Sequence, residues 1–291
     1  MRAKMMLGLV VVAGLVTGAC GKKKPEKEGA VVKGIPTKLT VKVLETGKGA
    51  KRQLRYKYTA GAKQAMIMDM RMAMSLNLGS RRVPEIRMPA IKFHMAMSVS
   101  KVHASGNMDM AFEVTQLEVV SRAGVRPSML SQMRRQLKAL EGFKGSMTMS
   151  PRGEPTNVKM VVPPGVPAQV RQTMENFQQQ MHQIMPPLPT EAVGVGAKWT
   201  AKMPITSPAF KAGQEATFEL MALHDASAEI KVSLRQWAPP QKMNPPNLPP
   251  TASAKLKKLE SKGKGSFRAF FTKPVVHASM SMDMDMSMHI K

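Results

Sequence analysis

The feature that most constrains the fold is a strict alternation of apolar and polar residues along much of the chain. The clearest run, residues 279–290, reads SMSMDMDMSMHI and has methionine at every second position from 280 to 288. Successive side chains of a β-strand point to opposite faces of a sheet, so this alternation is typical of a strand with one buried face. Similar runs occur at 65–78, 90–102 and 107–120. The sequence therefore predicts a protein built mainly from half-buried strands.

The order of the predicted elements defines the fold class. Five strands, the second of them at 53–61, precede a helix that begins at Pro127 and ends before Gly142. A hairpin, a second helix and six further strands follow, with 254–271 interpreted as a hairpin. The turn-rich connections leave no room for β-α-β crossovers, which argues against a parallel sheet. We expect a mainly β (α+β) fold: a large antiparallel, curved or half-barrel-like sheet of about a dozen strands with two mid-chain helices.

The expected organisation is a short leader, a tether and one β-rich body. A Lys, Glu, Pro and Gly-rich stretch at 20–36 has too little apolar surface to order itself. The body is predicted at 37–291, with halves 37–163 and 187–291 joined by the second helix, 165–185.

The first residues predict export. Arg2 and Lys4 precede an apolar run, and small residues then lead to Cys20, the only cysteine. This is the pattern of a signal peptide, here 1–19. The cysteine at the cut resembles the lipobox of bacterial lipoproteins, which implies that fatty acyl chains such as palmitate anchor Cys20 to a membrane. Lys22 stands where an aspartate retains some lipoproteins in the inner membrane, so the resemblance implies the outer membrane, facing the periplasm. The alternative is an ordinary secretory signal with a chance cysteine.

The net charge of +25 favours anionic partners. Lipid or other anionic envelope components fit this charge, although Lys and Arg also serve as the solvated faces of strands. We expect no nucleic acid partner, because no helix-turn-helix, zinc-finger or RNP pattern is present.

Methionine supplies the candidate site. We predict that the alternating methionines line a ligand cavity or a core, because Met is flexible and adapts to irregular shapes. The candidates are Met66, Met68, Met70, Met72, Met74, Met95, Met97, Met108, Met110, Met280, Met282, Met284, Met286 and Met288. A Cu(I) site of thioethers is an alternative, but the strict period and the out-of-phase His94 and His289 argue against it. A general bias of composition toward methionine would give the same pattern. We expect no metal.

No catalytic motif is present. The chain contains no Gly-x-Ser-x-Gly, His-Glu-x-x-His, P-loop or EF-hand sequence, and its histidines lack ligand spacing. We therefore expect neither an enzyme nor a cofactor.

Two segments, LRYKYTAG at 54–61 and PLPTEAVGVGAKW at 187–199, resemble a family of uncharacterised bacterial envelope lipoproteins. The overall layout is similar to lipoprotein carriers and mycobacterial lipid-binding lipoproteins, in which a half-barrel sheet holds acyl chains and helices cover it. The first resemblance implies a layout and no activity, because that family has no established function. Taken with the alternating methionines, the similarity of layout favours a membrane-anchored periplasmic lipoprotein that binds a lipid or hydrophobic ligand in a Met-lined cavity. A structural or interaction lipoprotein without a ligand is the other interpretation.

Overall fold

The computed structural model describes residues 34–290 except 79–80, 139, 162–186, 207–209, 244–253 and 275. The predicted signal peptide, Cys20 and most of the tether lie outside these residues, and so does the predicted helix 165–185. The signal peptide, the lipidation of Cys20 and the second helix therefore stay predictions.

Most of the described chain forms one sheet of 13 strands that does not close on itself. Its main path runs β1 (Thr40–Glu45), β10 (Lys198–Thr206), β11 (Lys211–Leu223), β12 (Ser227–Ala238), β14 (Ala254–Phe270), β15 (Val276–Ile290), β3 (Lys63–Leu78), β5 (Ala90–Val102), β6 (Met108–Val120), β7 (Lys144–Met149) and β8 (Pro155–Val161). In addition, β13 (Gln241–Met243) pairs with β14, β4 (Arg81–Arg87) pairs with β3, and β2 (Lys48–Gln53) and β9 (Ala192–Val195) form a separate small sheet. The mainly β prediction is confirmed.

The prediction of a purely antiparallel sheet is wrong, because the sheet is mixed. β15 runs parallel to β3, in register from His277 beside Ile67 to Met288 beside Leu78. The other described pairs are antiparallel. A parallel pair of successive strands needs a crossover connection. Since β3 and β15 are far apart in the sequence, the intervening strands make this connection and no crossover helix is required.

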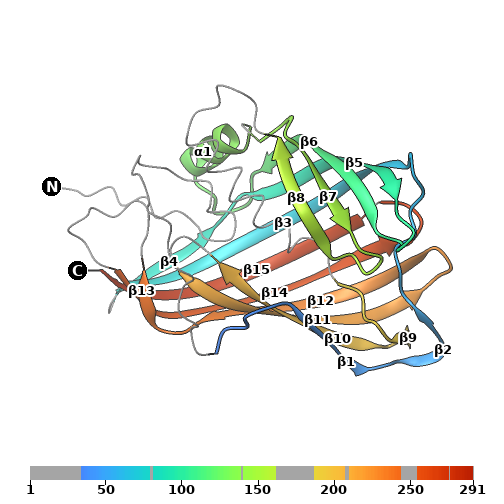
Figure 1. Cartoon of the computed structure of the whole chain (residues 1–291). Coiled ribbons are helices and arrows are strands. Elements are labelled where there is room, and N and C mark those ends of the chain that lie inside the picture. The colour runs from blue at the N-terminus through green and yellow to red at the C-terminus, as the bar shows by residue number, and fades with distance from the viewer. Residues whose placement is uncertain are drawn as a thin grey trace, which may run out of the picture.

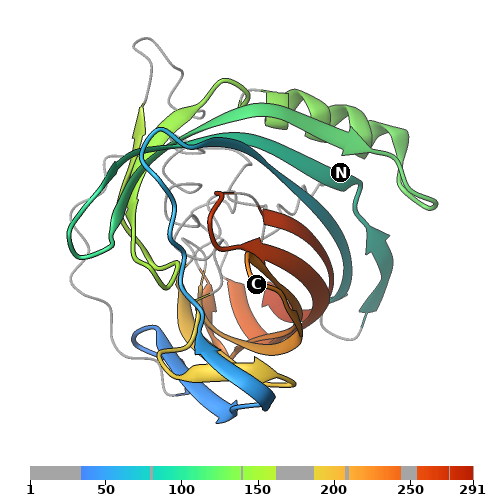
Figure 2. The same cartoon turned by 90° about the vertical axis from the view of Figure 1, so that its right-hand side faces the viewer.

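The parallel pair is a seam between two halves of the chain. Strands β3 to β8 lie on one side of the seam, and β10 to β15 lie on the other together with β1. Figure 1 shows the long strands side by side along the molecule, and Figure 2 shows them curving around a common interior. The sheet is therefore large and open, as the sequence predicted, and it is curved (Figure 2).

One helix, α1 (Pro127–Lys138), is present in the described part of the chain, where we predicted two mid-chain helices. It begins at a proline, whose fixed φ suits the first turn, and it lies beside β6 (Figure 1). Leu137 is buried in the core, and Arg135 and Lys138 occupy the last turn, where cations complement the helix dipole. Glu141, just beyond the helix, accepts a hydrogen bond from the backbone N–H of Leu117 at 3.0 Å.

Residues 54–62 form a strap across one end of the sheet, although the sequence predicted a strand at 53–61. The strap donates backbone hydrogen bonds from Tyr56 to Pro151 O and from Lys57 to Phe271 O, at 2.8 and 2.7 Å. These acceptors belong to turns on opposite sides of the seam. The alternation of the strap is nevertheless real, because Leu54, Tyr56 and Tyr58 are buried.

The predicted hairpin at 254–271 is also wrong, because these residues form the single long strand β14. In the structure, Gly263 and Gly265 lie within the ladder opposite Met282 and Met280. A Cβ at Gly265 would lie 2.3 Å from the carbonyl oxygen of Ser279, so this glycine permits a close approach of backbones.

Candidate ligand-binding face

The alternate residues of the long strands share one apolar face of the sheet, which we call the concave face. Cross-strand register places these residues in rows that continue from strand to strand. Two successive rows across β11, β12, β14 and β15 are Phe218, Val232, Gly265, Met280 and Ala216, Leu234, Gly263, Met282. Burial follows the same alternation along β12 and β15. The concave face is therefore continuous across the strands on this side of the seam.

Most of the predicted site methionines are buried in the structure. The buried ones are Met66, Met95, Met97, Met108, Met110, Met282, Met284, Met286 and Met288. Met70 and Met280 are half-buried and pack against the core. Met68, Met72 and Met74 belong to β3 and keep the alternation, but their side chains lie outside the described set.

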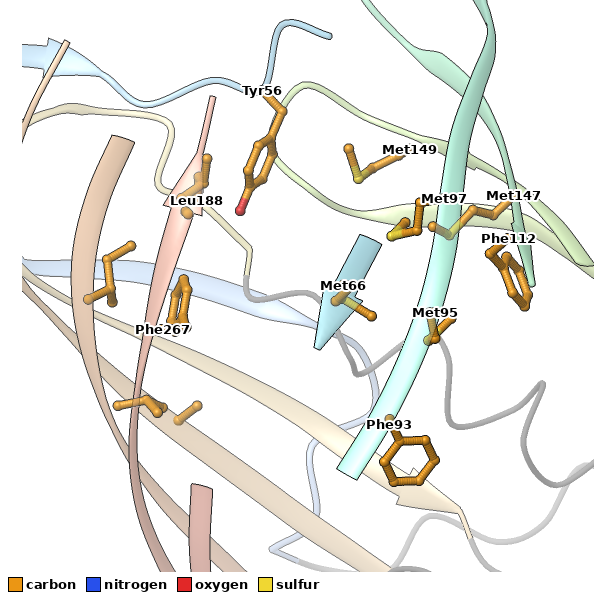
Figure 3. Packing of buried hydrophobic residues seen from close by; sticks show 14 of the residues in the cluster. Tyr56, Met66, Phe93, Met95, Met97, Phe112, Met147, Met149, Leu188 and Phe267 are labelled. Atoms are coloured by element: carbon orange, nitrogen blue, oxygen red, sulfur yellow. The ribbon is translucent and has the colours of Figure 1, made fainter. Parts of the chain in front are cut away.

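One group of these methionines is part of a packed core near the strap. Register pairs Met66 with Met95, Met110 with Met147, and Met108 with Met149. Figure 3 shows several of these methionines in the interior together with Tyr56, Leu188 and Phe267. Trp199 is also fully buried, and its indole N–H donates to Pro187 O at 3.1 Å. These methionines serve as ordinary core residues.

A second group lies toward the opposite end of β15. Met284, Met286 and Met288 are buried, with at most 7% of the residue exposed, but they do not belong to the packed core cluster. Register places them beside Ser261, Leu259 and Leu256 of β14. This group is the part of the predicted site that lies outside the packed core.

A row of polar side chains crosses the concave face beside Met284. Register aligns Met203, Gln214, Gln236, Ser261 and Met284 across β10, β11, β12, β14 and β15. Gln236 donates from Nε2 to Gln214 Oε1 at 2.8 Å, and Gln214 Nε2 lies 3.6 Å from the sulfur of Met203. The Ser261 hydroxyl is buried and has no hydrogen-bond partner within the described part of the chain.

Sequence reasoning missed this polar row, although a signal for it was present. Gln214, Gln236 and Ser261 occupy positions where the apolar alternation of their strands calls for an apolar residue. A polar residue in the apolar phase of one strand is easily taken for noise. Only the pairing of strands reveals that three such residues lie in one row.

Two tyrosines of the strap also carry buried hydroxyls without partners. The rings of Tyr56 and Tyr58 lie 5.6 Å apart between centroids, and neither phenol oxygen has a hydrogen bond to any described residue. Figure 3 shows Tyr56 extending from the strap into the interior. Burial raises the pKa of both phenols well above the usual value, and Tyr56 adds to the rise for Tyr58. Both side chains are therefore neutral hydrogen-bond donors at physiological pH.

Charged groups lie on the outer face, as the alternation predicted for the aspartates and lysines. Asp283 and Asp285 are exposed between buried methionines, and the lysines of β14 are exposed as well. His103 lies 2.8 Å from Asp109, and this hydrogen bond, followed by one from Thr148, lowers the pKa of that carboxyl. Within the described residues, no charged side chain is fully buried.

The structure places the candidate metal ligands apart from one another. His94 Nε2 lies 3.0 Å from Glu118 Oε1 on its own side of the sheet, and His289 is exposed. Among the side chains that the structure describes, no group of three or more His, Cys, Asp or Glu residues is arranged to hold a metal ion. Over the same part of the chain, no helix has the length and apolar character needed to cross a membrane.

Comparisons with protein-family models, with curated proteins and with solved structures found no match to this chain. A proposal for the function therefore rests on the fold and on the concave face alone.

Proposed function

We propose that this protein is a lipid-anchored envelope protein whose concave face binds a lipid or another long hydrophobic molecule. The observation that carries the proposal is the buried methionine group of β15, Met284 to Met288, which extends an apolar face beyond the packed core. An apolar sheet face must be covered to be stable in water. In an open sheet, a hydrophobic ligand can supply part of that cover.

The kind of residue on this face supports the same proposal. Methionine has three rotatable bonds and a polarizable sulfur, so a methionine surface adjusts to ligands of different shape. The length of the face is suited to an extended chain, because strand residues advance about 3.3 Å each. Met280 to Met288 alone therefore correspond to about 26 Å of apolar surface.

The membrane anchor rests on the sequence at Cys20. Acyl chains on this cysteine would hold the sheet near a bilayer, with the basic tether between them. Replacing Cys20 by Ser is expected to move the protein from the membrane fraction to the soluble periplasmic fraction. Retention of this variant in the membrane fraction would contradict lipidation as the anchor.

The ligand itself can be sought in residues 21–291, purified from a bacterial periplasm without detergent. Native mass spectrometry is expected to show a bound mass of several hundred daltons. Met284→Asp places a carboxylate on the apolar face and should remove that mass, because an unpaired buried charge is strongly disfavoured. Met221→Asp is the matched control, since Met221 is 51% exposed on β11.

Folding of the Met284 variant must be verified by circular dichroism. Met284→Trp is the second variant, because it keeps the site apolar while reducing its volume. A bare chain mass for the wild-type protein would contradict the proposal and favour a structural role. Equal ligand content in wild type and both folded Met284 variants would also contradict it.

A soft-metal site is a second candidate, favoured by the register at the seam. The parallel pairing sets Met280 beside Met70, Met282 beside Met72, and Met284 beside Met74. Thioether sulfur binds Cu(I), and adjacent strands bring these pairs nearer than successive positions on one strand do. Stoichiometric uptake of Cu(I) in competition with bicinchoninate, lost in Met282→Leu, would support this function. A protein that stays copper-free would exclude it.

A further inference from the structure

The polar row of Gln214, Gln236 and Ser261 lies on the buried face of the sheet, where apolar residues are expected. All three residues are buried on the concave face, with 8%, 4% and 2% of their surface exposed. Their strands are adjacent, so the row spans about 10 Å from β11 to β14. Thr200 is the other buried polar residue of the described chain, and it belongs to the opposite phase of β10, between Trp199 and Ala201.

The hydrogen bonds of this row all point from β12 toward β10, and none involves Ser261 on β14 among the described residues. Gln236 donates to Gln214, and Gln214 is directed to the sulfur of Met203, which is a weak acceptor. At the β14 end, Ser261 Oγ has no hydrogen-bond partner among the residues that the structure describes. Burying a hydroxyl without a hydrogen bond is unfavourable, and native proteins pair the large majority of such groups. An apolar residue at position 261 would avoid this cost.

The surroundings of the row define the chemistry of what it can bind. In the described chain, the row is flanked on the same face by Met203 and Met284 and by apolar residues of the adjacent rows, so the row itself offers no charged partner for a carboxylate, a phosphate or an ammonium group. A serine hydroxyl and a glutamine amide both donate and accept hydrogen bonds. They suit a neutral ester, amide or hydroxyl, and the methionine group beside Met284 suits an apolar chain attached to it.

From this juxtaposition we propose that Ser261 and Gln236 bind the neutral polar linkage of the ligand, an ester, amide or hydroxyl group, while its apolar chain lies on the methionines of β15. This inference rests on the proposed function, because it assigns the ligand class at the same face. It excludes a simple hydrocarbon and a ligand whose charged group is buried at this row.

The test uses three probes of similar length: methyl laurate, pentadecane and sodium laurate. Each displaces the fluorescent dye phenylnaphthylamine from residues 21–291, and the affinity is obtained from the displacement curve. Wild-type protein is expected to bind methyl laurate about tenfold more tightly than pentadecane, the effect of about one net hydrogen bond. Laurate is expected to bind more weakly than its methyl ester, because its charge would be desolvated.

Ser261→Ala is the informative variant, since it removes one hydroxyl and no hydrogen bond of the protein. It is expected to lose most of the preference for the ester over the hydrocarbon. Ser266→Ala is the matched control on the same strand, because Ser266 is exposed on the outer face; it should keep the preference. Gln236→Leu provides a second variant, which should also reduce the preference while keeping pentadecane affinity.

The outcomes separate this inference from the proposed function. If the dye binds and all neutral probes displace it equally, the polar row does not recognise the polar linkage of the ligand, although the proposed binding of a hydrophobic molecule is still supported. If laurate binds most tightly, or if Ser261→Ala retains the wild-type preference, the inference is also wrong. If neither dye nor any probe binds, the proposed function fails together with it.

Discussion

The buried phenol of Tyr56 allows a direct test of the strap. Tyr56 is 1% exposed, its ring packs on Tyr58 and Phe271, and its hydroxyl has no hydrogen-bond partner. Tyr56→Phe keeps the ring and removes only the hydroxyl. Because an unpaired buried polar group costs about 1–3 kcal/mol, we expect the free energy of unfolding to rise by up to that amount. Tyr56→Ala, which removes the ring, should instead lose about 3–5 kcal/mol.

The assay is urea unfolding at equilibrium, followed by the fluorescence of Trp199, which is fully buried. A second signature appears at high pH. Burial raises the folded-state pKa of Tyr56, so the phenol of the unfolded chain ionises first. The stability of the wild-type protein that depends on a neutral Tyr56 is therefore fully present below about pH 10 and is lost as the pH rises above that value. Tyr56→Phe should lose less stability there than wild type. A variant destabilised by more than about 1 kcal/mol at pH 7 would refute the reasoning, because the hydroxyl would then have a partner in solution.

Three further predictions concern packing and charge. Gly145→Ala should destabilise the fold by about 1–3 kcal/mol in thermal unfolding, because the added Cβ would lie 2.4 Å from a phenylalanine ring carbon of β6; an unchanged midpoint would contradict this contact. Met110→Ala should cost about 2–5 kcal/mol in urea unfolding, since Met110 is fully buried in the packed core, and a cost below about 1 kcal/mol would indicate a loose core. Glu141 has a lowered pKa because Lys138 and then the backbone N–H of Leu117 donate hydrogen bonds to it. Its stabilisation is therefore present above about pH 4.3 and is lost as the pH falls below that value, so the stability gap between wild type and Glu141→Gln should shrink between pH 7 and pH 3.

The half-buried faces of the strands were predictable from the sequence because burial acts on alternate residues. A slip of one residue would turn an entire strand inside out, so the apolar phase must match the buried face. Met95 and Met97 on β5, and Met282 to Met288 on β15, are buried in the predicted phase. The exposed Asp283 and Asp285 between them confirm the same register.

The parallel seam was not predictable by the same reasoning. The expectation of antiparallel pairing considered strands that follow one another in sequence, and their short connections do exclude parallel neighbours. Pairing between β3 and β15 depends on how two halves of the chain meet, and no local signal encodes it. Likewise, the sequence predicts a hairpin at 254–271, whereas Gly263 and Gly265 lie within a paired ladder, where Gly265 permits a close approach of backbones.

The sequence predicted which methionines are buried, but it did not predict that they fall into two separate groups. The sequence grouped all alternating methionines as one set. The structure separates Met95 and Met110, which belong to the packed core, from Met284 and Met286, which do not. Ser261 Oγ distinguishes the second group, but only the structure shows that this buried hydroxyl lacks a hydrogen bond to the described residues.

The distribution of methionine within the sheet argues against a general bias of composition. Such a bias would place methionine at the apolar positions of every strand. Instead, β15 carries methionine at every second position from 280 to 288, whereas β12 and β14 contain none and fill the same concave face with Ile, Val, Leu, Phe, Ala and Gly. On the other side of the seam, β3 and β5 again carry methionine. Methionine is thus concentrated at the seam and in the half of the sheet from β3 onward, where it mostly fills the packed core. The group from Met284 to Met288 differs, because it lies outside that core and beside the polar group of β14.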